Sequence, residues 1–123
     1  MDSILELNVV PFDAGMSVTL RGDLDQQAEQ KIRSVLNWEE GLGEGRRYLI
    51  LNLHEVSFIT SAGMALLIRI ARTGRKTGYH TFICGASAHY QKLFRMVGLT
   101  EYVMLYPDDY AALQRIEALE SGV

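Results

Sequence analysis

The chain of 123 residues contains a single cysteine, Cys84, so an intramolecular disulfide is impossible. Because Cys84 lies inside the apolar stretch TFICG, and free cysteines are usually buried, we expect an inert core thiol rather than a nucleophile. No apolar run approaches the ~20 residues that a membrane-spanning helix needs. The N-terminal stretch MDSILELNVV also lacks the basic region and cleavage site of a signal peptide. These absences predict a cytoplasmic protein without direct membrane insertion.

The sequence also lacks basic character and the usual signatures of catalysis. Its formal net charge is −3 at pH 7, which argues against nucleic acid as a partner. The three histidines, His54, His80 and His89, have no metal-ligand spacing. Neither a nucleotide-phosphate loop nor a nucleophile-elbow motif occurs. We therefore expect no cofactor, no metal site and no enzymatic activity.

The hydrophobic pattern is typical of an α/β domain. Residues 4–10 and 16–22 alternate apolar and polar side chains on either side of a turn at 13–15, which predicts a β-hairpin. The later stretch YLILNLH is apolar on both strand faces, as in a central strand covered from both sides. Helical and strand patterns then alternate, so the predicted order is β-β-α-β-α-β-α-β-α. We expect one domain over residues 1–123, with a mixed β-sheet of four to five strands flanked by about four helices.

Two carboxylates stand at the start of the first predicted helix, in DLDQQAEQKIRSVLNW. Asp25 is well placed as its N-cap, where an acidic group also complements the helix dipole. Asp23 is then a solvated residue, and the two are not expected to form a catalytic pair.

The stretch FITSAGM joins a predicted strand that ends near Phe58 to a predicted helix that begins at about Ser61. Thr60 or Ser61 therefore occupies or adjoins the helix N-cap. One interpretation is purely structural: a capping hydroxyl accepts a backbone N–H and contributes ~1 kcal/mol. The other is that a phosphate fits here, because the free N–H groups of a helix N-terminus bind anions. The residues alone leave both open.

The helix after this junction is apolar over more of its circumference than a core-facing stripe requires. Its apolar side chains sweep roughly 200°, whereas a stripe of little more than ~100° suffices to face a core. The surplus is covered either by flanking segments of this fold or by another protein. Met64 and Ile68, at one end of the arc, are the candidates for exposed residues that bind a partner.

Three segments together resemble a known family. LILNLHEVSFITSAGMALLIRIAR is similar to the core of a STAS domain, as found in bacterial anti-sigma factor antagonists, in which a loop reading Asp-Ser-Ser-Gly or a variant separates an apolar strand from an apolar helix. Here the loop is Thr60-Ser61-Ala62-Gly63. RGDLDQQAEQKI resembles the family's segment before its first helix, and FRMVGLTEYVMLY its late helix and last strand. The resemblance spans about residues 4–118.

The resemblance implies a partner switch. An unmodified antagonist of this family binds an anti-sigma factor, often itself a serine/threonine kinase, which phosphorylates the antagonist and so releases it; a PP2C-type phosphatase restores binding. The matching acceptor is Ser61, with Thr60, at the usual Asp position, as a weaker alternative. Gly63 would keep a side chain away from an approaching partner. The partner-binding residues expected are Asp23, Asp25, Thr60, Ser61, Ala62 and Gly63, together with Met64 and Ile68.

A second function is compatible with the same resemblance. Some STAS-like proteins are constitutive accessory subunits of ABC lipid-transport complexes. In such a subunit Ser61 would only cap the helix, and the face around Met64 would be a permanent interface.

Overall fold

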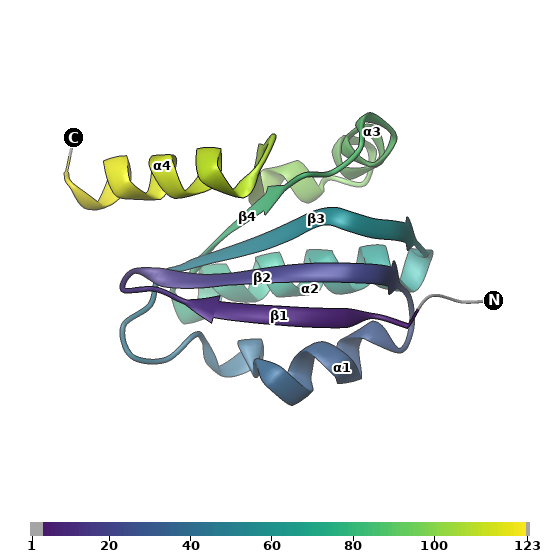
Figure 1. Ribbon diagram of the computed structural model, residues 1–123, viewed down its shortest axis with the longest axis horizontal. Helices are drawn as coiled ribbons and strands as arrows, with labels where there is room; N and C mark the ends of the chain where they lie inside the picture. Colours follow the sequence, from purple (N-terminus) through teal and green to yellow (C-terminus); the bar gives the residue numbers. More distant parts are fainter. Residues whose placement is uncertain (1–3, 123) are drawn as a thin grey trace.

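The computed structural model describes residues 4–122, in which one five-stranded sheet is flanked by four α-helices (Figure 1). The strands are β1 (Glu6–Pro11), β2 (Gly15–Leu24), β3 (Tyr48–Ile59), β4 (His80–Cys84) and β5 (Val103–Tyr106). The helices are α1 (Ala28–Val35), α2 (Ser61–Thr77), α3 (Ala88–Met96) and α4 (Asp109–Glu120), with short 3-10 helices η1 (Trp38–Glu40) and η2 (Leu99–Glu101). The predicted α/β class and element order are confirmed.

The strands lie in the sheet in the order β1-β2-β3-β4-β5. β1 and β2 form the expected antiparallel hairpin, and every later pair is parallel. β3 is central, and its successive residues Leu49 and Ile50 point to opposite faces yet are both buried. This double burial explains why the strand reads as a continuous apolar run rather than an alternating one.

Two cores lie on the two faces of the sheet. The larger one includes Ile32 of α1, Leu67 of α2 and Phe94 of α3, so these three helices share one face. The smaller one lies under α4, whose Ala112 and Ile116 pack over β3 and β4. The two layers hold the start of α2 at one end of the sheet, where β3 ends.

Cys84 belongs to the smaller core and has no exposed surface. Burial, reinforced by the nearby charges of Asp109 and Asp108, raises the pKa of the thiol to about 12. The thiol is therefore protonated at neutral pH, and the expectation of an inert core cysteine is confirmed.

The start of α1 differs from the expectation. The helix begins at Ala28 with Gln27 in the N-cap position, so the prediction that Asp25 is the N-cap is wrong. Asp25 instead accepts a hydrogen bond on Oδ1 from the backbone N–H of Gln27 at 2.9 Å, while its carbonyl accepts one from Ala28. Such a bond from a side chain to the backbone two residues on forms an Asx turn, which delays the helix.

Candidate functional site

The junction between β3 and α2 is held by Thr60. This residue is the N-cap of α2, in extended conformation, and its Oγ1 accepts a hydrogen bond from the N–H of Gly63 at 3.2 Å. The same hydroxyl donates to the carbonyl of Leu24 at 3.3 Å, and the N–H of Thr60 donates to that carbonyl at 2.9 Å. Thr60 thus caps the helix and ties it to the end of β2. A carboxylate at this position would cap equally well but has no proton to donate to Leu24.

Ser61 presents a different environment one residue later. It is the first residue of α2, its side chain is exposed, and its hydroxyl makes no hydrogen bond to the described residues 4–122. The first turn of α2 contains no acidic residue, whereas its last turn carries Arg75 and Lys76. The positive end of this 17-residue helix is therefore not offset by an acid of its own first turn, and it favours added negative charge near Ser61.

The next two residues of the loop motif have separate environments. Ala62 is exposed beside Ser61, whereas Gly63 is buried. A Cβ on Gly63 would lie 2.1 Å from the carbonyl oxygen of Leu24. The expectation that Gly63 leaves room for an approaching partner is therefore wrong, because the backbone of β2 already fills that space.

The predicted exposure of Met64 is also wrong. Only 9% of Met64 is accessible, and Ile68 is half-buried against the same larger core. The two flanks of α2 are covered by the short helices η1, which contributes the buried Trp38, and η2, which contributes Leu99. Of the two alternatives for the wide apolar arc, the structure shows the first: flanking segments of this chain bury it.

A groove beside the junction brings together residues from three segments. Asp23 at the end of β2, Asp25 in the following turn and Thr60 before α2 all line it, and its volume is 770 Å³. Asp23 lies opposite Phe58 in the parallel pairing of β2 with β3, which explains the convergence. Phe58 is 56% exposed and lines the groove with Ile4, which is 80% exposed. Lys31 also lines the groove, which thus combines charged groups of both signs with exposed apolar side chains.

Neither Phe58 nor Tyr90 was singled out by the sequence patterns. Phe58 reads as one more apolar strand residue, and only the end of the sheet next to it leaves it exposed. Tyr90 belongs to α3, yet its hydroxyl accepts a hydrogen bond from the N–H of Ile59 at 2.9 Å. β3 continues to Ile59 beyond Asn52, the last residue that pairs with β4. Tyr90 therefore holds the overhanging end of β3, immediately before the junction.

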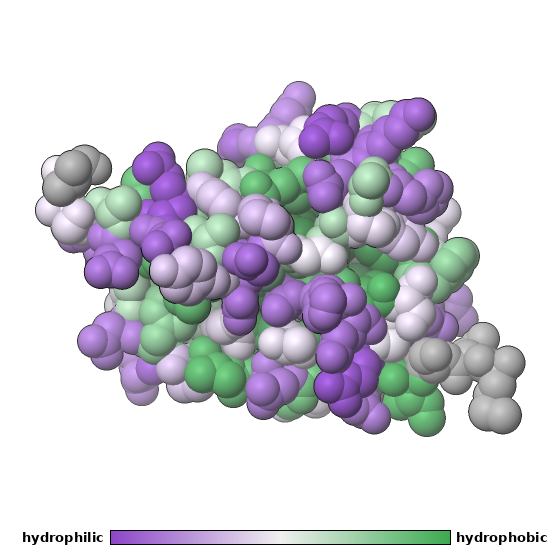
Figure 2. All heavy atoms as spheres, turned by 45° about the horizontal axis from the view of Figure 1, so that its top comes forward, coloured by the Kyte–Doolittle hydropathy of each residue, from purple (hydrophilic) through white to green (hydrophobic). Residues whose placement is uncertain are grey.

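On the face shown in Figure 2, hydrophobic residues are interspersed with polar ones. Within residues 4–122, no three His, Cys, Asp or Glu side chains gather as a metal ion would require. No helix in that range is both long and apolar enough to cross a bilayer.

Comparison with known proteins places this geometry in a family. The STAS domain model matches residues 7–112. The unphosphorylated anti-sigma factor antagonist SpoIIAA is 20% identical, covers 93% of this chain and 98% of its own, and has a TM-score of 0.71. A variant of RsbS from Moorella thermoacetica is 16% identical over 94% of this chain and 97% of its own, with a TM-score of 0.78. The murine Slc26a9 anion transporter is 20% identical over 89% of this chain but only 18% of its own, with a TM-score of 0.74. At these identities the structural likeness shows a shared fold.

Proposed function

The chain belongs to the STAS domain family, and we propose that it is an anti-sigma factor antagonist whose binding is controlled by phosphorylation of Ser61. In its unmodified form it binds an anti-sigma factor that is also a serine/threonine kinase. Phosphorylation by that kinase releases it, and a PP2C-type phosphatase returns it to the binding form. In this role the protein is a binding module and a kinase substrate in the cytoplasm rather than an enzyme.

The observation that carries the proposal is the contrast between two adjacent hydroxyls. The Thr60 hydroxyl is occupied by hydrogen bonds to Gly63 and Leu24, whereas the Ser61 hydroxyl is exposed. A kinase can therefore reach Ser61 without unfolding the cap, and Thr60 is the poorer acceptor. A phosphate on Ser61 adds a charge of about −1.5 to −2, which the N-terminus of α2 can accommodate.

The comparisons support the same mechanism. The similar structures include SpoIIAA in its unphosphorylated form, with a TM-score of 0.71, and the Bacillus protein in its phosphorylated form, with a TM-score of 0.68. Proteins of this fold therefore exist in both states. For the present chain, the exposure of Ser61 supports a switch that needs no large change of shape.

The groove beside Ser61 supports the binding half of the proposal. Exposed Phe58 and Ile4 offer apolar contact, while Asp25 and Lys31 offer charged groups of both signs to a partner. Phosphorylated Ser61 would bring a bulky hydrated dianion to the edge of this surface. A loss of ~3 kcal/mol of interaction weakens binding about a hundredfold, which is enough to release a partner.

The test uses purified anti-sigma factors of the host, each measured against the full chain by isothermal titration calorimetry. We expect one of them to bind the wild-type protein, and ATP with Mg²⁺ to place a phosphate on Ser61 and dissociate the complex. Ser61→Asp should bind about a hundredfold more weakly. Ser61→Ala should bind but should not be released by ATP. Ser121→Asp adds the same charge at an exposed serine after α4 and should bind like the wild type.

Three results would contradict the proposal. The first is that none of the anti-sigma factors binds the wild-type chain. The second is that the phosphate maps to a residue other than Ser61, and the third is that Ser61→Asp binds as tightly as the wild type. The last result, combined with co-purification with the ATPase of an ABC lipid-transport complex, would instead favour a constitutive subunit of such a complex.

A further inference from the structure

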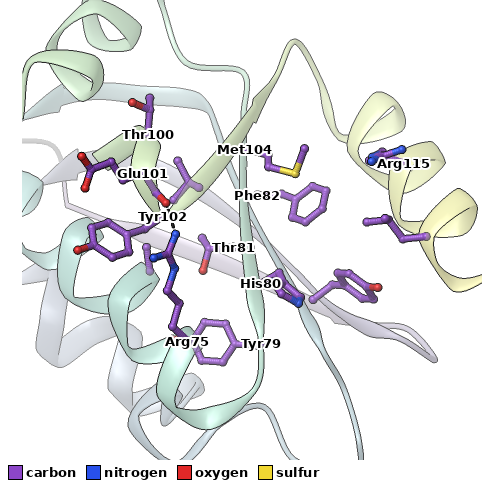
Figure 3. A pocket seen from close by; sticks show the side chains of 14 residues that line it. Arg75, Tyr79, His80, Thr81, Phe82, Thr100, Glu101, Tyr102, Met104 and Arg115 are labelled. Carbon is purple, nitrogen blue, oxygen red and sulfur yellow. Dashed lines mark hydrogen bonds between the residues drawn. The ribbon is translucent and has the colours of Figure 1, made fainter. Parts of the chain in front are cut away.

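The two edges of the sheet differ in how they are protected from another strand. An edge strand presents free backbone N–H and C=O groups, which can pair with a strand of another chain. β5, one of the two edges, is only four residues long, Val103–Tyr106. A second cavity, of 440 Å³, lies at its start and at the other end of α2 from Ser61, and Arg75, Glu101 and Arg115 line it (Figure 3). A short strand with charged neighbours is a protected edge.

β1 forms the opposite edge and lacks this protection over most of its length (Figure 1). It runs over Glu6–Pro11, so its charged residue is the first and its proline is the last. The residues between them, from Leu7 to Val10, carry no charge. Charges and prolines are what usually block strand addition, and here both stand at the ends.

The register of the hairpin identifies the backbone groups on the free edge. Phe12 and Gly15 exchange two hydrogen bonds at the turn, and in an antiparallel ladder such pairs alternate with pairs that exchange none. Counting back from the turn, Val10 bonds to β2, whereas Leu7 and Val9 direct their N–H and C=O groups to the free edge. No backbone hydrogen bond from elsewhere in residues 4–122 reaches these groups.

The side chains of β1 are compatible with a second copy of the same strand. If Leu7 pairs with Val9 of an antiparallel second copy, symmetry pairs Val9 with its Leu7. Asn8 then stands opposite Asn8, and Glu6 opposite Val10, so no like charges face each other. Leu7 and Val9 are half-buried against the larger core. The added strand would cover apolar surface that they still expose.

Pro11 favours this register over its nearest alternative. Shifting the second copy by two residues keeps the overlap but places Leu7 opposite Pro11. Pro11 has no N–H to donate, so this register loses hydrogen bonds at both ends. The register centred on Asn8 uses only residues with a backbone N–H, and Pro11 ends the ladder beyond Val10.

We propose that the chain forms a symmetric dimer in which the β1 strands of two copies pair antiparallel about a two-fold axis at Asn8. The same surface serves on both copies, as in other two-fold interfaces, and the two sheets join into one. Main-chain hydrogen bonds supply the affinity, as in other cases of strand addition. β2 separates this edge from β3, which leads to Ser61, so the dimer does not rest on the proposed switch.

The first test is the association state of the full chain, measured by sedimentation equilibrium from ~10 µM to ~1 mM. We expect a monomer–dimer equilibrium in this range, because a single pair of strands makes a small interface. In the same samples, amide hydrogen exchange should slow at Leu7 and Val9 as the concentration rises. The amides of Asn8 and Val10 already bond to β2, so their exchange should change far less.

Charges at Asn8 test the position of the axis. Asn8 is exposed, so Asn8→Asp and Asn8→Lys should both fold normally. Each variant alone places like charges opposite each other and should weaken self-association about fivefold. An equimolar mixture of the two should associate at least as tightly as the wild type, because opposite charges then face each other. Ser121→Asp and Ser121→Lys, at an exposed position after α4, are the matched controls and should associate like the wild type.

Four results would overturn the dimer. The first is a wild-type chain that stays monomeric at ~1 mM. The second is association that neither Asn8 variant weakens, since the dimer would then use another surface. The third is a mixture that associates no better than either variant alone. The fourth is protection of Leu7 and Val9 only when a purified anti-sigma factor is added, because the edge would then accept a strand of that protein.

Discussion

The close approach of α2 to β2 at Gly63 leads to a prediction with an unusual sign. A glycine-to-alanine change inside a helix normally stabilises it by up to ~1 kcal/mol. Here the added Cβ would lie 2.1 Å from the carbonyl oxygen of Leu24 and 2.7 Å from the carbonyl carbon. That oxygen belongs to backbone and already accepts hydrogen bonds from Thr60, so it cannot turn away as a flexible side chain would.

The magnitude follows from the size of the overlap. Restoring an ordinary contact requires the start of α2 and the end of β2 to separate by about 1 Å, which lengthens the Thr60 hydrogen bonds and loosens the core behind them. Overpacking of this kind costs ~1–3 kcal/mol. We expect the net effect of Gly63→Ala to be destabilisation within that range, or a fall in melting temperature of roughly 5–15 °C.

The assay is urea denaturation followed by circular dichroism, with Ala62→Gly as the matched control. Ala62 is the exposed neighbour in the same helical turn, and its replacement should cost up to ~1 kcal/mol through helix propensity alone. If Gly63→Ala proves as stable as the wild type or more stable, the gain in helix propensity exceeds the cost of steric overlap with Leu24. The packing of α2 on Leu24, and with it the geometry of the Ser61 junction, would then be wrong.

Three further predictions test other parts of the structure. Thr60→Val should lower the free energy of unfolding by ~1 kcal/mol in urea denaturation, because it removes the cap, whereas Thr60→Ser should retain most of the stability. The Cys84 thiol, with a pKa of about 12, should not react with a thiol reagent at pH 8 until the protein unfolds, and the two rates should match when followed together. Hydrogen bonding and charge from Arg69 lower the pKa of Glu29 below its ordinary value of 4.5. Its contribution to stability is therefore present at neutral pH and lost as the pH falls below about 4.5, so acid denaturation curves of Glu29→Gln should show a smaller loss.

The order and type of the elements were predictable because each carries a local signal. Period-two alternation marks the hairpin, and the unbroken apolar run marks the central strand. The last helix shows how a single residue fixes a boundary: Asp108 is the N-cap of α4, and its Oδ1 accepts a hydrogen bond from the N–H of Ala111 at 2.8 Å. At α1 the same reasoning placed the N-cap at Asp25, two residues before its position at Gln27 in the structure. An Asp side chain can form a turn as readily as a cap.

The burial of Met64 could not be predicted from the periodicity of its own helix. What buries the flanks of α2 are two 3-10 helices, one in the Trp38 segment that follows α1 and one at Leu99 after α3. Helices of three residues have no measurable periodicity, so the pattern gave no sign of them. An apolar arc wider than one stripe indicates additional cover, but it does not distinguish cover by the same chain from cover by a partner.

The Ser61 junction and the cavity at the other end of α2 differ in how far local sequence patterns can locate them. The switch junction lies within one contiguous stretch, so a strand pattern, two hydroxyls and a helix pattern locate it from sequence. The cavity at the other end of α2 instead draws Arg75 from α2, Thr81 from β4 and Arg115 from α4, with Tyr102 from the connection between η2 and β5. None of these residues is unusual in its own segment, and only the parallel pairing of β4 with β5 and the placement of α4 bring them together.

Under the proposed function, the two adjacent hydroxyls at the start of α2 have separate tasks: that of Thr60 holds the fold, and that of Ser61 takes the modification. Thr60, in extended conformation before the helix, directs its hydroxyl to Leu24, whereas Ser61, the first residue of the helix, is exposed to solvent. The bonds that hold β2 to α2 are therefore made by a residue next to the exposed acceptor rather than by the acceptor itself. Charge added to Ser61 meets the positive end of a helix, which favours it by ~0.3–1 kcal/mol. Under the proposed function, the folded state therefore tolerates a charge at Ser61 that would weaken the binding of a docked partner.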